Sequence, residues 1–121
     1  MKRDLDLMRS MMLRIEEQTS GDIYLRRAAF DDLCENLDAI SYHLRILLDA
    51  GFIEALDLSS SSGEDYAVRG LTFAGCDYLD AIRDKSIWEK VKKKISSIGG
   101  SASVEIVKAL AVSIARTSLG I

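Results

Sequence analysis

The chain has 121 residues, of which 48% are hydrophobic and 29% charged, and its formal net charge at pH 7 is −3. This length suits a single domain, and the composition excludes an intrinsically disordered chain. No apolar run approaches the ~18 residues that a membrane span needs, and the first residues lack the apolar core of a signal peptide. We therefore expect a cytoplasmic protein without membrane contact. Cys34 and Cys76 belong to no paired motif, which favours a reduced chain without a disulfide.

The N-terminal part of the chain predicts three helices and one short strand. In chain order these are a helix at residues 4–18, a strand at 22–26, a short helix at 28–35 and a helix at 37–50. The helices are predicted from apolar residues at spacings of three and four, and the strand from aromatic and β-branched residues. Asn36 is expected to cap the helix at 37–50, and Gly51 to end it.

The remainder predicts a β-hairpin followed by three helices. In chain order these are strands at residues 52–56 and 66–71 and helices at 73–85, 86–98 and 104–117. A polar, serine-rich loop joins the two strands, as is typical of a hairpin turn. Thr72 is expected to cap the first of these helices, and Ser86 the second through a capping box.

This order of elements is typical of a winged helix, in which helices pack on a small antiparallel sheet and the hairpin forms the wing. We predict an α+β, mostly helical fold, a winged helix-turn-helix with a small antiparallel β-hairpin wing and extra C-terminal helices. The expected domains are a winged-helix domain over residues 1–98 and a C-terminal helix over 99–121. That helix is expected to pack on the domain or on a partner.

Three segments of the chain resemble a bacterial and prophage family, the domain of unknown function 2513. They are residues 1–7, residues 42–54 and residues 70–84. Phe73 and Cys76 stand where tryptophan and histidine are common in that family. The resemblance implies a winged-helix-like, phage-linked protein and brings no assigned activity with it.

The residues offer little support for catalysis or for a metal site. The chain has one histidine and no Cys-x-x-Cys or His-x-x-x-His spacing, and its glycines form no phosphate-loop pattern. Cys34 and His43 would be a nucleophile and a base only if the fold brought them together, and a free cysteine is usually a small buried hydrophobe. We predict a protein that is not an enzyme and that uses no cofactor, metal or small-molecule substrate.

Charge is strongly segregated along the chain. Residues 31–57 carry seven acids against Arg45 alone, whereas residues 83–94 carry a net charge of +4. At about 100° per residue, the helix at 37–50 turns four polar side chains outward and leaves two more at the boundary of its buried stripe. The outward ones are Asp38, Tyr42, Arg45 and Asp49, and the boundary ones are Ser41 and His43. Carboxylates are repelled by phosphates, so this helix is disfavoured for the major groove.

Three surfaces remain as candidates for a partner. Four lysines of the helix at 86–98 form either a solvated face or a surface that tracks phosphates. Tyr42 and Ile46 present an aromatic and an aliphatic group that suit a protein contact. The last helix carries apolar residues beyond one stripe, so it either closes the core or docks on a partner or a second copy.

Our prediction is a non-catalytic, phage-linked winged-helix regulatory or adaptor module that acts through protein contacts. The alternative is a DNA-binding transcriptional regulator. The candidate residues for contact with a partner or with nucleic acid are Tyr42, Arg45, Ile46, Lys90, Lys92, Lys93 and Lys94.

Overall fold

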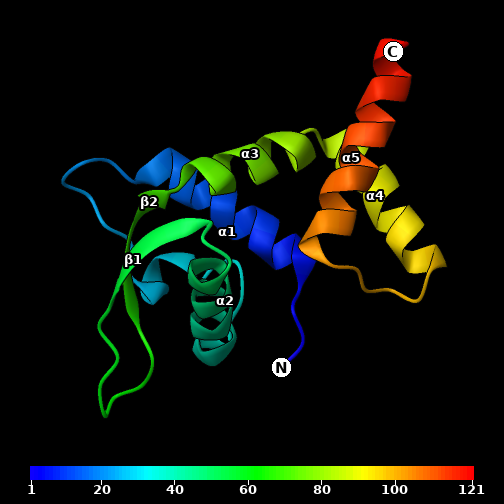
Figure 1. Cartoon of the computed structure of the whole chain (residues 1–121). Coiled ribbons are helices and arrows are strands. Elements are labelled where there is room, and N and C mark those ends of the chain that lie inside the picture. The colour runs from blue at the N-terminus through cyan, green and yellow to red at the C-terminus, as the bar shows by residue number, and fades with distance from the viewer. The chain divides into compact units, whose positions relative to one another are not determined.

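A computed structural model describes all 121 residues and contains five α-helices, one 3₁₀ helix and one antiparallel hairpin (Figure 1). The elements are α1 (Leu5–Gln18), η1 (Arg27–Phe30), α2 (Leu37–Asp49), β1 (Ile53–Asp57), β2 (Tyr66–Leu71), α3 (Phe73–Ile82), α4 (Lys85–Ser97) and α5 (Val104–Leu119). The expected α+β, mostly helical class is confirmed. None of these helices is both long enough and apolar enough to cross a membrane.

The chain divides into two compact units, Met1–Cys76 and Asp77–Ile121. We expected a boundary after residue 98. In the structure α4 belongs to the same unit as α5, because these two helices pack on each other.

The core of the first unit is formed by α1, α2 and the hairpin, with α1 packed on β2 and α2 packed on η1 and β1. Its fully buried residues include Met11, Met12, Ile15, Phe30, Ile40, Leu44, Leu47 and Val68. Each such side chain stabilises the fold by about 1.5–3 kcal/mol relative to an exposed position. The apolar stripes of the predicted helices at 4–18 and 37–50 are therefore the faces that the unit buries.

The ends of α2 follow from its flanking residues as the sequence predicts. The Asn36 side chain accepts hydrogen bonds from the backbone N–H groups of Asp38 and Ala39. At the other end, Gly51 adopts φ +76°, a left-handed conformation that residues with a Cβ rarely adopt. This turn brings β1 directly after α2.

The hairpin agrees with its prediction, whereas the segment before it differs. β1 and β2 pair antiparallel from Ile53 opposite Leu71 to Asp57 opposite Tyr66. The strand expected at residues 22–26 is absent and is replaced by isolated bridges. The chain turns back on itself there, because Ser20 pairs with Ile23, and only Leu25 is left to pair with β2.

Two further local predictions were wrong in detail. The short helix expected at residues 28–35 is one turn of 3₁₀ helix, η1, whose end is fixed to α1 by Arg14. The Arg14 guanidinium donates to the carbonyl of Ala29 at 2.7 Å and to both carboxylate oxygens of Asp32 at 2.8 Å. The cap of α4 is Asp84 rather than Ser86, since the Asp84 carboxylate accepts from the backbone N–H of Ile87.

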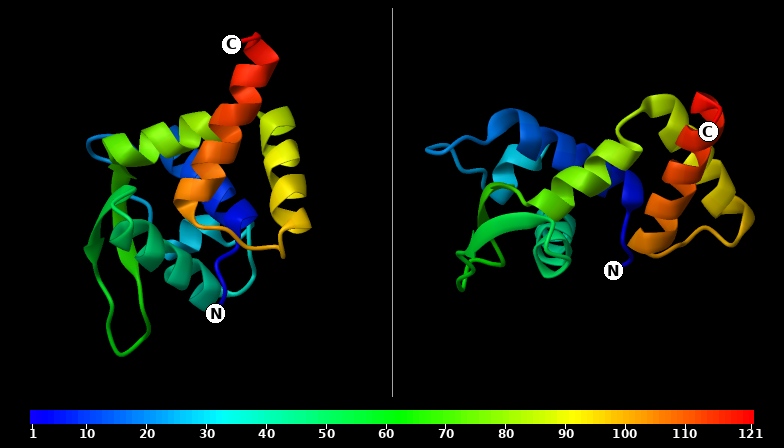
Figure 2. Two further views of the ribbon diagram at one scale, coloured as in Figure 1. Left: turned by 45° about the vertical axis from the view of Figure 1, so that its right-hand side comes forward. Right: turned by 45° about the horizontal axis from the view of Figure 1, so that its top comes forward.

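The second unit contains a helical hairpin of α4 and α5. Trp88, Val91 and Ile95 of α4 are buried, as are Val107 and Ala111 of α5. Ile98, the last residue of the helix predicted at 86–98, is 61% exposed, because α4 ends at Ser97 and the chain turns through two glycines with positive φ. The C-terminal part of α5 extends past the N-terminal end of α4 (Figure 2, left).

Candidate interaction surface on α2 and the hairpin

The outward side of α2 carries the three first-unit residues predicted for partner contact. Tyr42 and Ile46 are half-buried, and Arg45 is exposed. The Arg45 guanidinium lies 5.4 Å from the centre of the Tyr42 ring, so the two side chains form one cation–π contact. Asp38 and Asp49 are exposed at the two ends of the helix. Ile46 takes no part in the polar contacts of this surface.

Carboxylates of the hairpin hold the two exposed arginines of this surface. The Nε atom of Arg45 lies 3.0 Å from Oε1 of Glu64. The guanidinium of Arg26 donates to Oδ2 of Asp65 through Nε at 3.0 Å and through Nη2 at 2.7 Å. Both positive charges are therefore already compensated within the first unit.

A buried serine joins the hairpin to α2 beneath these ion pairs. The Ser41 hydroxyl, only 1% exposed, donates to the backbone carbonyl of Glu64 at 2.6 Å. Nη1 of Arg27 donates to the same carbonyl at 3.0 Å. Gly63 adopts φ +126°, and a Cβ there would lie 3.2 Å from the Arg27 guanidinium. The end of the hairpin is thus fixed to α2 through its backbone as well as through its carboxylates.

The same contacts alter the acidity of two hairpin groups. Partial burial opposes ionisation of Asp65, but hydrogen bonds from Arg26 and from the backbone N–H groups of Arg27 and Tyr66 outweigh it and lower the pKa of Asp65. Burial raises the pKa of Tyr66 well above its ordinary value, and its hydrogen bond to the Glu64 carboxylate adds to the effect. At neutral pH the surface therefore holds an ionised Asp65 and an un-ionised Tyr66.

His43, which the sequence placed at the boundary of α2, is only 3% exposed. Its Nε2 atom accepts from the backbone N–H of Asp4 at 2.9 Å, and Nδ1 lies 2.7 Å from the carbonyl of Ala39. Nδ1 therefore carries the hydrogen in this arrangement. Both ring nitrogens bind backbone groups, so neither is free to act as a base or a metal ligand.

The cysteines and the other possible metal ligands do not assemble into a site. The half-buried Cys34 and the exposed Cys76 are free thiols, and the Cys34 sulfur contacts the carbonyl of Asn36. No group of three His, Cys, Asp or Glu side chains is arranged to hold a metal ion.

The four candidate lysines lie on α4 in the second unit. Nζ of Lys92 lies 3.2 Å from Oε1 of Glu89. Lys90, Lys93 and Lys94 are exposed and form no ion pair. These three side chains provide positive charge that no carboxylate of the chain compensates.

The sequence did not reveal Arg26 and Arg27, at the start of η1, as members of the surface. Arg26 contacts Asp65 across 39 positions of sequence, and Arg27 contacts Ser41 across 14. Neither spacing belongs to a known sequence motif, so only the tertiary fold shows that Arg26 and Arg27 lie at the hairpin.

Comparison with known proteins places the chain in a family. The family model described as "Hypothetical protein (DUF2513)" matches residues 2–102. An uncharacterized protein of Haemophilus influenzae is 35% identical over 114 residues, covering 94% of this chain and 95% of that protein. No solved structure matches the chain. The match spans most of the sequence, and the chain belongs to the DUF2513 family of hypothetical proteins.

Proposed function

We propose that the first unit is a winged helix, with the β1–β2 hairpin as its wing and α2 as the counterpart of a recognition helix. The order α1, η1, α2, β1, β2 supports this assignment. A one-residue third strand supports it further, since Leu25 and Val68 exchange two backbone hydrogen bonds of 3.0 and 2.8 Å. In DNA-binding members of this architecture, the recognition helix lies in the major groove.

We infer that this protein uses the winged helix differently, as a non-catalytic, phage-linked regulatory or adaptor module that acts through protein contacts. The observation that carries this proposal is the compensation of Arg45 by Glu64 and of Arg26 by Asp65. A DNA phosphate would have to displace both carboxylates, while Asp38 and Asp49 repel it. The two free thiols are in keeping with a reducing, cytoplasmic location.

The chemistry of the surface indicates the kind of partner that fits it. Tyr42 and Ile46 offer a half-buried aromatic and aliphatic centre, and tyrosine is enriched at the energetically important positions of interfaces. Exposed carboxylates of Asp38 and Asp49 lie toward the two ends of the same helix. A protein with an apolar contact flanked by basic side chains is complementary to this arrangement.

Photo-crosslinking in the native host tests the proposal. A photoreactive phenylalanine analogue at position 42 should yield one discrete protein adduct that survives nuclease treatment. The same analogue at the exposed position Glu17 on α1 is the matched control and should not yield that adduct. Charge reversal of Asp38 or Asp49 should reduce the yield, because the basic flank of the partner then loses its counter-charge. A nucleic-acid adduct at position 42, or no difference from the control position, would contradict the proposal.

A second candidate, a DNA-binding regulator, is favoured by one observation. Lys90, Lys93 and Lys94 are exposed and unpaired on α4, so phosphate contacts there displace no carboxylate. Such contacts would be independent of sequence and would weaken steeply with salt. Replacing all three lysines by alanine should remove this binding, while Arg45→Ala should leave it unchanged.

A further inference from the structure

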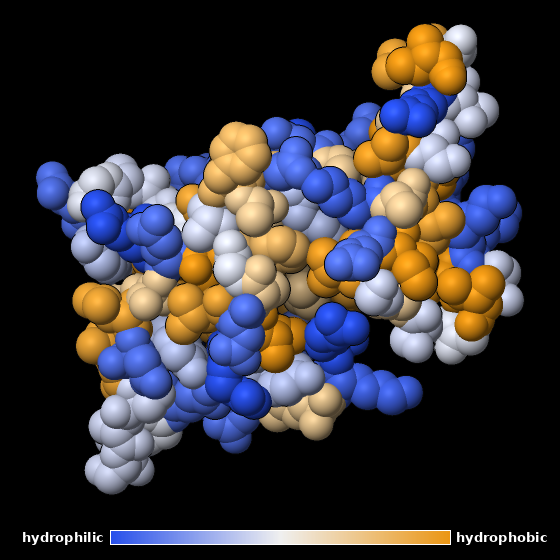
Figure 3. All heavy atoms as spheres, viewed as in Figure 1, coloured by the Kyte–Doolittle hydropathy of each residue, from blue (hydrophilic) through white to orange (hydrophobic).

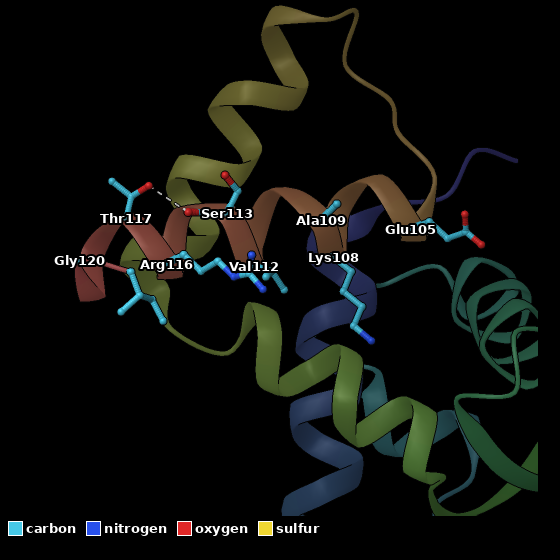
Figure 4. A pocket seen from close by; sticks show the side chains of 9 residues that line it. Glu105, Lys108, Ala109, Val112, Ser113, Arg116, Thr117 and Gly120 are labelled. Carbon is cyan, nitrogen blue, oxygen red and sulfur yellow. Dashed lines mark hydrogen bonds between the residues drawn. The ribbon is translucent and has the colours of Figure 1, made fainter.

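The face of α5 opposite its buried side is unpartnered. Val107 and Ala111 face the core of the second unit. At about 100° per residue, Glu105, Ala109, Val112 and Arg116 lie together roughly 180° away from those two residues. Glu105, Ala109, Val112 and Arg116 are all exposed and border an open groove along the helix (Figure 4). The face therefore combines a small apolar centre with one charge near each end.

The charges on this face are of opposite sign and are not used within the chain. Glu105 lies in the first turn of α5 and Arg116 in the last, and neither forms an ion pair. Lys108, which lies between them, is already bonded to Asp77 of the same unit. Arg116 lies eleven positions after Glu105, which is about three helical turns, so the two charges lie on the same side of the helix.

From this arrangement we propose that α5 binds α5 of a second copy of the chain in antiparallel orientation. A two-fold axis between Ala109 and Val112 places Glu105 of each helix opposite Arg116 of the other. The same axis sets Ala109 against Val112, and side chains this small allow close approach of two helices. A parallel pairing would instead oppose Glu105 to Glu105 and Arg116 to Arg116, which is repulsive. The charge pattern thus favours a second copy of α5 as the partner and an antiparallel orientation of the two helices.

Exposed apolar groups at the end of α5 extend the same interface. Leu119 is 72% exposed and Ile121 is 83% exposed, and apolar atoms gather at this end of the helix (Figure 3). The 16 residues of α5 span about 24 Å. One helix face of this length buries less area than a standard stable interface, so the dimer is weak and concentration-dependent. The inference is independent of the function proposed for α2 and the hairpin.

Two single charge reversals and their mixture test the proposal on the full chain. Glu105→Arg gives a chain with arginine at both positions, and Arg116→Glu gives one with glutamate at both. Sedimentation equilibrium of the wild type up to about 0.5 mM should show a mass rising toward two chains. Each variant alone should associate about tenfold more weakly, because like charges then face each other. An equimolar mixture of the two should regain the wild-type association.

Two controls separate association from folding. Circular dichroism should show that both variants retain their helix content, and Lys93→Glu on α4 should leave the association unchanged. A wild type that stays monomeric throughout the range overturns the proposal. Variants that are folded and dimerise as the wild type does, or a mixture of folded variants that stays monomeric, overturn it as well.

Discussion

Replacing Gly75 by alanine should destabilise the first unit, because α3 approaches the backbone of Phe52 at this residue. Gly75 is buried near the start of α3, and a Cβ added there would lie 2.0 Å from the Phe52 carbonyl oxygen. Ordinary contact begins near 3.4 Å, so the helix and the Phe52 backbone would have to separate by about 1.4 Å. That separation also strains the hydrogen bond of 3.0 Å from Thr72 N–H to the same carbonyl.

The expected loss in the free energy of unfolding is the cost of overpacking minus the gain from the higher helix propensity of alanine. Overpacking of a rigid site costs about 1–3 kcal/mol or more, and a Gly→Ala exchange inside a helix returns up to about 1 kcal/mol. Because the clash is with backbone atoms, we expect a net loss of about 2 kcal/mol. In a chain of 121 residues this corresponds to a fall in Tm of about 6–10 °C.

Thermal and urea denaturation followed by circular dichroism measure this loss. Gly21→Ala is the matched control, since nothing lies within 4 Å of a Cβ at that position, and its effect should stay within about 0.5 kcal/mol. A Gly75→Ala variant whose Tm lies within about 2 °C of the wild type would refute the close approach of α3 to Phe52.

Three further substitutions probe the surface and the two cores. The ordinary pKa of an aspartate is about 3.8, and that of Asp65 is lower in the folded state. The stabilisation that ionised Asp65 provides is therefore fully present above its ordinary pKa and is lost as pH falls through its folded-state pKa. Asp65→Asn should flatten the acid limb of a Tm-against-pH curve. His43→Ala leaves the Asp4 N–H and the Ala39 carbonyl without their partner, so urea titration should show a loss of about 2–4 kcal/mol. Trp88 is 1% exposed, so Trp88→Ala leaves a large cavity beside α4 and should cost about 3–5 kcal/mol by the same method.

The parts of the fold with a local signal were predictable from the sequence. The apolar stripe of α2, its asparagine cap and the glycine that follows it specify one helix and its exit without reference to other segments. The hairpin likewise followed from two β-prone runs around a serine-rich loop. Asp84, and not the predicted Ser86, caps α4, because the Asp84 carboxylate also accepts a hydrogen bond from a backbone N–H of the first turn.

The candidate surface was predictable only in its α2 residues. A helical wheel sorts the residues of α2 from the sequence of the helix alone, whereas Ser41 and His43 hydrogen-bond to backbone groups 23 and 39 positions away. The compensation of Arg26 and Arg45 likewise depends on how the hairpin folds back. The sequence showed that the region is acidic, and the tertiary structure shows which arginines those acids hold.

The most direct test of the proposed function is the affinity of duplex DNA for the wild type, Arg45→Ala and Glu64→Gln, measured by fluorescence anisotropy at physiological salt. Glutamine keeps the shape of Glu64 and its acceptor for the Tyr66 hydroxyl but frees Arg45 from its carboxylate. If this surface acts through protein contacts, we expect weak, sequence-independent binding by the wild type, no loss with Arg45→Ala, and a gain of about fivefold with Glu64→Gln. Tight, sequence-dependent binding by the wild type that Arg45→Ala abolishes would contradict it.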